Sequence, residues 1–159
     1  MYLKGSHSKS CAQPSISVQS KDMKKDPLQS TEPKPTITGK VIHGMKLGRK
    51  LGFPTANLDR RSYGKTTPVF PFGIYGGHAQ IGTKAKLYPA AIVIGPFDSK
   101  GLPKLEVHIL DFKADLYGEK VTAWPDIFIR EFKEYTSEQK LIQDIQNDIK
   151  IIRKKLKLQ

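Results

Sequence analysis

Glycines and cations recur through residues 39–58, the part of the sequence best suited to chemistry. The segment is GKVIHGMKLGRKLGFPTANL. Repeated glycine lets peptide N–H groups approach a ligand closely, and Arg49 and Lys50 place two cations beside them. Such a combination suits a phosphate-bearing ligand. A structural hairpin with surface charges has the same composition, so the residues alone leave both interpretations open.

Two oxygen-bearing side chains follow this loop, in the order Pro54-Thr55-Ala56-Asn57. On an extended chain, residues two apart point to the same side. The Thr55 hydroxyl and the Asn57 amide oxygen are hard ligands of the kind that Mg²⁺ takes when it is shared with phosphates. The pattern suggests a magnesium site next to the glycine-rich loop.

Glu106 is a carboxylate on an otherwise aliphatic segment, KLEVHILDF. Alternation predicts a strand with Leu105, Val107 and Ile109 on one face and Glu106, His108 and Leu110 on the other. In phosphoryl transfer such a carboxylate can accept the proton of the attacking alcohol. The alternative is an exposed strand residue. For His108, a packed or surface histidine is the favoured interpretation.

The elements that must position these groups are predicted to be β-strands from about residue 36 to Arg130. Short alternating or apolar runs are separated by turn residues, which favours a closed antiparallel barrel over a parallel sheet. The predicted strands are TITGKVIHG, FGIYGGHAQIG, LYPAAIVIG, KLEVHILDF and KVTAWPDIFI. Pro125 forces an edge or a bulge in the last of them.

After residue 135 the spacing of the apolar residues changes from that of a strand to that of a helix. Thr136 and Gln139 have the spacing of a helix capping box. An apolar face with helical period then packs on the barrel. Its members are Leu141, Ile145, Ile149, Ile152 and Leu156.

Composition sets the broad class. Residues 1–35 are polar and nearly free of aromatics, which predicts a disordered tail before a folded domain at 36–159. The net charge is +12, and we interpret the lysine-rich ends mainly as solvated surface. No apolar run is long enough to span a membrane, and the N-terminus lacks a secretory pattern. With Cys11 as the single cysteine, a reducing, cytoplasmic setting is expected.

Four blocks, in order, resemble the riboflavin kinase family, both its stand-alone members and the kinase module of bacterial FAD synthetases. The first is G-x-V-x-x-G-x-x-x-G-R-x-L-G-F-P-T-A-N, and the others are FGIYGGHA, LEVHILDFKADLYGEKV and FIREFKEYTSEQKLIQDIQNDI. The resemblance covers roughly residues 37–157. It implies a six-stranded Greek-key barrel with a C-terminal helix, and transfer of the ATP γ-phosphate to the riboflavin 5′-hydroxyl to give FMN.

The resemblance also implies roles at matching positions. Glu106 corresponds to the catalytic base, and Thr55 and Asn57 to the holders of Mg²⁺, or of Zn²⁺ or Mn²⁺. The positions implied for nucleotide binding are Gly44, Arg49, Lys50, Thr55, Ile109, Asp111 and Tyr117. Those implied for flavin binding are Arg130, Lys133 and Tyr135.

Besides the loop from Tyr63 to Phe70, which is unlike that of relatives, the sequence departs from the family at three places. The loop Gly95-Pro96-Phe97-Asp98-Ser99-Lys100 is atypical, Phe132 stands where an acidic residue is usual, and Trp124-Pro125-Asp126 interrupts a strand. The first of these three departures borders the flavin in the family.

Three alternatives stay open on the residues. One is a basic small barrel that binds single-stranded nucleic acid, although the aromatics are too dispersed for the usual stacking platform. Another is a catalytically silent flavin-binding relative. The third, half of a bifunctional enzyme, is disfavoured because no H-x-G-H motif occurs. We therefore expect a monomeric kinase with riboflavin and ATP as partners, and neither nucleic acid nor membrane.

Overall fold

The computed structural model describes residues 34–61, 63 and 70–158. Internal contacts divide the chain into Met1–Glu32 and Pro33–Gln159, and the described residues belong to the second unit. The predicted disordered tail therefore lies almost wholly outside the described residues.

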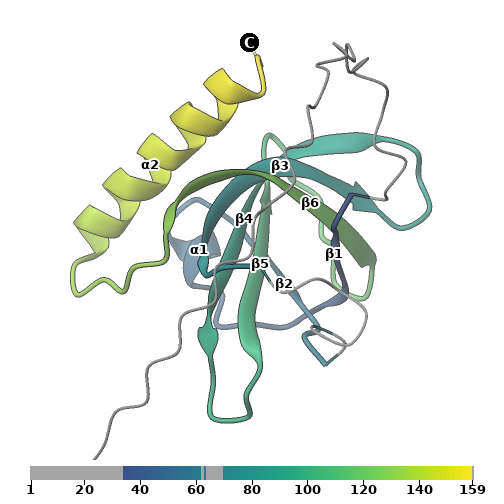
Figure 1. The fold of residues 1–159 in the computed structure, drawn as a ribbon, viewed down its shortest axis with the longest axis horizontal. Coiled ribbons are helices and arrows are strands. Elements are labelled where there is room, and N and C mark those ends of the chain that lie inside the picture. The colour runs from purple at the N-terminus through teal and green to yellow at the C-terminus, as the bar shows by residue number, and fades with distance from the viewer. Residues whose placement is uncertain (1–33, 62, 64–69, 159) are drawn as a thin grey trace, which may run out of the picture. The chain divides into compact units, whose positions relative to one another are not determined.

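Six antiparallel strands close into a barrel (Figure 1). They are β1 (Ile37–Ile42), β2 (Ala56–Leu58), β3 (Gly73–Ile81), β4 (Leu87–Phe97), β5 (Pro103–Ile109) and β6 (Lys120–Glu131). The ring order is β1-β2-β5-β4-β3-β6. Strands β3, β4 and β5 form a meander and β6 returns beside β3, which is a Greek key. The predicted six-stranded Greek-key barrel is confirmed.

Strand alternation fills the barrel interior. Leu105, Val107 and Ile109 are at most 4% exposed and face the core, while Glu106 and His108 are partly exposed on the outer face, as predicted. Strand β2 has only 3 residues, too few to show an alternating pattern in the sequence. It completes the ring by pairing with β1 and β5.

Pro125 lies at a bulge in β6. The register with β3 slips by one residue between the pairs His78–Trp124 and Gly76–Ile127. A closed ring has no edge strand, so of the two predicted outcomes, edge or bulge, the bulge is observed. Gly77 faces this point, and a side chain there would overlap the carbonyl oxygen of Trp124.

Helix α2 (Glu138–Lys155) packs on β3, β4 and β6 (Figure 1). Its buried anchor is Ile152, which contacts the bare backbone of Gly76: a Cβ on Gly76 would lie 2.9 Å from Ile152 Cγ1. Ala91 and Leu110 complete this second apolar cluster. The amphipathic helix is thus confirmed.

The predicted start of this helix is wrong by one residue. Ser137, not Thr136, is the N-cap, since Ser137 has extended backbone and its side chain accepts a hydrogen bond from the Lys140 N–H. The Ser137 carbonyl accepts the first helical bond, from Leu141. Thr136 has the spacing of a cap but lies outside the helix.

The glycine-rich segment contains a short helix that the sequence pattern did not indicate, α1 (Leu47–Lys50). Lys46, before it, and Gly52, after it, both have left-handed backbone, with φ of 57° and 86°. Among the described residues, no helix is long and apolar enough to cross a membrane.

Candidate active site

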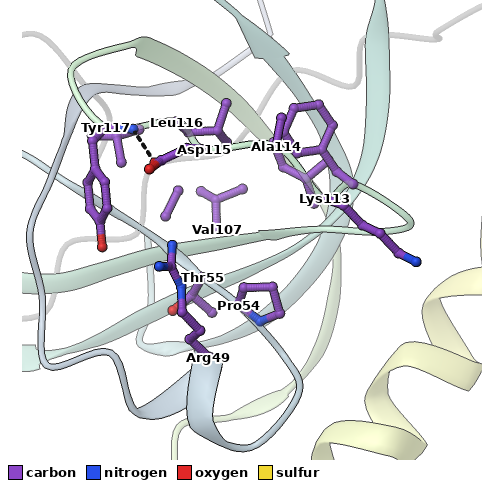
Figure 2. A pocket seen from close by; sticks show the side chains of 13 residues that line it. Arg49, Pro54, Thr55, Val107, Lys113, Ala114, Asp115, Leu116 and Tyr117 are labelled. Atoms are coloured by element: carbon purple, nitrogen blue, oxygen red, sulfur yellow. Dashed lines mark hydrogen bonds between the residues drawn. The ribbon is translucent and has the colours of Figure 1, made fainter.

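A pocket of about 400 Å³ opens at one end of the barrel (Figure 2). One side is formed by α1 and the chain entering β2, another by the loop that follows β5. Its lining residues are Val41, Arg49, Pro54, Thr55, Ala56, Val107, Ile109, Phe112, Lys113, Ala114, Asp115, Leu116 and Tyr117. Four residues predicted for nucleotide binding line it: Arg49, Thr55, Ile109 and Tyr117.

Tyr117 organises one wall of the pocket. The Arg49 guanidinium carbon lies 5.8 Å from the centre of its ring, and the His43 ring stacks on it at 4.0 Å. Figure 2 shows Arg49 and Tyr117 reaching toward each other from separate segments. A cation held against an aromatic ring in a pocket is suited to an anionic ligand that also has a flat ring.

The loop that contains Tyr117 is fixed to β1. Gly118 donates its N–H to the Val41 carbonyl at 3.0 Å, and Val41 donates to the Glu119 carbonyl at 2.8 Å. Asp115 accepts a hydrogen bond from the Tyr117 N–H and closes a turn. Residues 112–116 were missed as pocket residues, because in the sequence they are only turn formers between two strands.

Thr55 and Asn57 both face the glycine-rich loop. A Cβ on Gly44 would overlap the Asn57 amide, and one on Gly48 would lie 3.3 Å from Thr55 Oγ1. The two glycines therefore leave room at these oxygens that larger residues would occupy. Within the described part of the chain, neither side chain has a hydrogen-bond partner, so both oxygens remain available to a ligand.

Glu106 stands beside Asn57. The register pairs Asn57 of β2 with Glu106 of β5, so both side chains project from the same outer face. Side chains paired in this way have Cβ atoms about 5 Å apart. Glu106 is 21% exposed, and its Oε1 lies 3.4 Å from Lys104 Nζ. Neither Glu106 nor Asn57 lines the pocket, but Thr55, two residues before Asn57, does.

His108 supports the segment that contains Thr55. Its Nδ1 lies 2.8 Å from the Pro54 carbonyl oxygen. Because a carbonyl only accepts, Nδ1 must bear the proton and donate. The His108 ring also packs edge-on against Phe53. As favoured from the sequence, His108 is a packed histidine, and the residue that it positions is Pro54.

Two other predicted nucleotide residues lie outside the pocket lining, Lys50 and Asp111. Asp111 has left-handed backbone, with φ of 57°, and its carboxylate accepts from Arg153 of α2 at 2.6 and 2.7 Å. Gly44 also lies outside the lining and contacts Asn57 instead.

The three residues predicted to bind flavin all contact acidic residues of α2. Arg130 pairs with Asp148 at 2.8 Å, Tyr135 donates its hydroxyl proton to Asp144 at 2.6 Å, and Lys133 Nζ lies 3.8 Å from the same carboxylate. Burial and the hydrogen bond to Asp144 raise the pKa of Tyr135 to about 12. That hydrogen bond, with Lys133 and Arg130 nearby, lowers the pKa of Asp144.

One of the departures from the family pattern also lies on the outer face. A Cβ on Gly95 would lie 3.1 Å from Phe132 Cε2 and 2.8 Å from the Cβ of Lys104. Lys104 pairs with Gly95 two residues before Glu106 on β5. Phe132 therefore covers the sheet next to the Glu106 side chain.

No group of three His, Cys, Asp or Glu side chains among the described residues could hold a metal ion. The oxygen donors that the structure does bring together are those of Thr55 and Asn57. They fit a hard divalent cation that takes further ligands from a phosphate.

Comparison with known proteins identifies the family. A family model described as "Flavokinase: Riboflavin kinase" matches residues 32–156. The chain belongs to the riboflavin kinase family. The human riboflavin kinase is 33% identical over 124 residues, which are 76% of this chain and 79% of that protein.

Other riboflavin kinase relatives are longer than the matching region. An "RNA-binding riboflavin kinase RibR" of Bacillus subtilis is 37% identical over 123 residues, 77% of this chain and 51% of that protein. A bifunctional riboflavin kinase/FMN adenylyltransferase of Buchnera aphidicola is 38% identical over 122 residues, 75% of this chain. The chain spans only 38% of that relative.

Solved structures agree with the family fold. The crystal structure of the riboflavin kinase of Trypanosoma brucei has a TM-score of 0.59 and 26% identity, covering 77% of this chain and 79% of that one. A Streptococcus pneumoniae structure described as a macrolide-efflux protein has a TM-score of 0.65 and 31% identity. It covers 75% of this chain and 38% of that one.

Proposed function

We propose that this protein is a riboflavin kinase that transfers the γ-phosphate of ATP to the 5′-hydroxyl of riboflavin, giving FMN and ADP. One observation carries the proposal: Asn57 and Glu106 are paired across β2 and β5, and Thr55, two residues before Asn57, lines the pocket. The arrangement places oxygen ligands for a cation and a proton acceptor side by side. Both have a part in the transfer of a phosphoryl group to an alcohol.

The pocket supplies the nucleotide side of the proposed reaction. Its lining includes the aliphatic side chains of Val107 and Ile109, together with the Arg49 cation and the Tyr117 ring. We assign the adenosine to this pocket and the phosphates to the glycine-rich loop, where Gly44 and Gly48 leave space beside Asn57 and Thr55.

Thr55 and Asn57 would hold a divalent metal together with ATP phosphate oxygens. When bound, the metal would neutralise charge on the phosphates. These neutral oxygen donors favour Mg²⁺, which is usually held by few protein ligands plus phosphates and water. The metal preference is tested by comparing FMN formation with Mg²⁺, Mn²⁺ and Zn²⁺ at matched free concentrations.

Glu106 is proposed as the general base. Its carboxylate accepts the proton of the riboflavin 5′-hydroxyl while that oxygen bonds to the γ-phosphorus. The bond from the γ-phosphorus to the bridging oxygen breaks, and ADP leaves with the electron pair. Lys104 Nζ lies 3.4 Å from Glu106 Oε1, so a cation stands beside the carboxylate that is proposed to accept the proton.

The deciding experiment separates flavins chromatographically after incubation with riboflavin, ATP and Mg²⁺. The wild type should form FMN, and Glu106→Gln should lower kcat by about a hundredfold or more, the usual contribution of a general base. Glu138→Gln, the same change on an exposed residue of α2, is the matched control and should keep full activity. Failure of the wild type to form FMN would refute the proposal.

The proposal extends to the state of the protein: a monomer in the cytoplasm that does not bind nucleic acid. Size-exclusion chromatography with light scattering tests the first point. Because the Bacillus relative is named as RNA-binding, an RNA-binding assay is also pertinent. Tight binding to RNA that weakens steeply with salt would contradict the last point.

A further inference from the structure

Asp148 is the one charged residue that is buried among the described residues, with 4% of its surface exposed. A buried carboxylate is costly unless it is paired and fully hydrogen-bonded. Asp148 lies on α2, next to the apolar face that packs on the barrel. Asp148 should therefore have a positively charged partner that donates hydrogen bonds to its carboxylate oxygens.

That partner is Arg130, held in a bidentate fork. Arg130 Nε donates to Asp148 Oδ1 at 3.0 Å, and Nη2 donates to Oδ2 at 2.8 Å. Arg130 Nη1 donates to the carbonyl oxygen of Glu131 at 3.1 Å. A fork of this kind fixes the plane of the guanidinium as well as its distance. Burial opposes the charge, but the bond to Asp148 outweighs it and raises the pKa of Arg130.

Arg130 shares a row of the outer sheet face with Glu106. The register runs from Glu106 to Val93, from Val93 to Ile74, and from Ile74 to Arg130. The two residues between them in this row, Val93 and Ile74, are apolar, and Ile74 is buried with 7% of its surface exposed. A flat, apolar ring system that reaches Arg130 along this side of the barrel would have its hydroxyl tail at Glu106.

The Asp148 carboxylate belongs to a helix that is firmly attached to the barrel. One turn C-terminal to Asp148, Ile152 of α2 is fully buried against Gly76. One turn N-terminal to it, Asp144 holds Tyr135 and Lys133. The chain that connects β6 to α2 is thus held by two carboxylates on one face of one helix.

We infer that Asp148 is a positioning residue for the acceptor: it holds Arg130 in the orientation that receives riboflavin. The inference rests on the proposed kinase function. It goes beyond that function by assigning to α2 a part in acceptor binding, in addition to bracing the barrel. It predicts an effect of Asp148 on riboflavin and none on ATP.

The test measures the KM for riboflavin and the KM for ATP separately in the full-length protein. Asp148→Asn keeps the volume but removes the charge. It should raise the KM for riboflavin about ten- to a hundredfold, the scale expected when a binding group is displaced by about 1 Å. The KM for ATP should stay within about twofold. Asp126→Asn, which removes an ion pair on β6 itself, is the control and should change neither constant.

A second variant covers the case in which Asp148→Asn fails to fold. Replacing a buried ion pair by apolar residues of similar volume is often neutral for stability. The double variant Arg130→Met/Asp148→Leu should therefore stay folded, as judged by thermal melting, and still lose riboflavin affinity. Folded variants with the wild-type KM for riboflavin would overturn the inference alone. A wild type that forms no FMN would overturn the proposed function and the inference with it.

Discussion

At the scale of single residues, the proposed chemistry depends on Asn57 and Glu106 lying close together, which the short pairing of β2 with β5 ensures. Strand β2 shares only two register pairs with β5, and one of them is Asn57–Glu106. The Asn57 amide is also packed against the bare backbone of Gly44. A change at Gly44 should therefore act on the cation ligand without touching the base.

Gly44→Ala is predicted to displace the Asn57 amide, because the new methyl group would overlap it. The side chain can rotate away, so stability should change little while the KM for MgATP rises about tenfold or more. Steady-state kinetics over a range of MgATP concentrations checks this. Gly101→Ala is the control: its φ of 68° makes the change strained, so it should cost stability and leave the KM unchanged. An unaltered KM in Gly44→Ala would remove Asn57 from the proposed metal site.

At the scale of elements, α2 contacts both candidate sides of the reaction. Asp144 and Asp148, in the middle of the helix, hold Tyr135 and Arg130. Arg153, in its last turn, holds Asp111, on the loop that forms the nucleotide pocket. The helix therefore connects two loops that are separate in the sequence.

The contact between Tyr135 and Asp144 predicts a specific pH dependence. The pKa of Tyr135 is about 12 in the folded protein, while an unfolded tyrosine titrates near about 10. Since the folded value is raised, the stabilisation is fully present below pH ~10 and is lost as the pH rises from ~10 to ~12.

Tyr135→Phe should therefore be less stable than the wild type at neutral pH, and the difference should shrink above pH ~10. Urea unfolding at a series of pH values measures it. Tyr88→Phe, which keeps the Tyr135–Asp144 bond, should follow the pH course of the wild type. A difference between Tyr135→Phe and the wild type that stays constant up to pH ~12 would contradict the assignment.

At the scale of the whole molecule, two apolar clusters carry the stability. The larger fills the barrel and the smaller joins α2 to its outer surface. Ile152 is the fully buried member that α2 contributes to the smaller cluster. The attachment of the helix depends on it.

Ile152→Ala is predicted to destabilise the protein by about 2–5 kcal/mol, the usual cost of emptying a buried isoleucine site. Chemical denaturation monitored by circular dichroism measures the free energy of unfolding. Leu87→Ala removes a side chain that is 52% exposed and should cost much less, within about 1 kcal/mol. Equal losses in the two variants would show that α2 does not depend on this anchor.

The sequence predicted those features of the fold that depend on the spacing of apolar residues or on a local motif. Alternation at Leu105, Val107 and Ile109 is a local property, so it predicted which face of β5 enters the core. The cross-strand neighbours of Glu106 follow from a register between segments about fifty residues apart, which no local pattern contains. For the same reason no local pattern singles out Asp148, because its partner Arg130 comes from another element.

The ring order has a consequence for how the protein is made. Strand β6 lies between β1 and β3, and Thr38 bonds to Thr122 across 84 positions of the chain. Until β6 has left the ribosome, the facing sides of β1 and β3 are both unpaired strand edges. Closing such a ring requires contacts between distant residues, which form slowly. During synthesis, the nascent chain is thus most exposed to aggregation just before its last strand emerges.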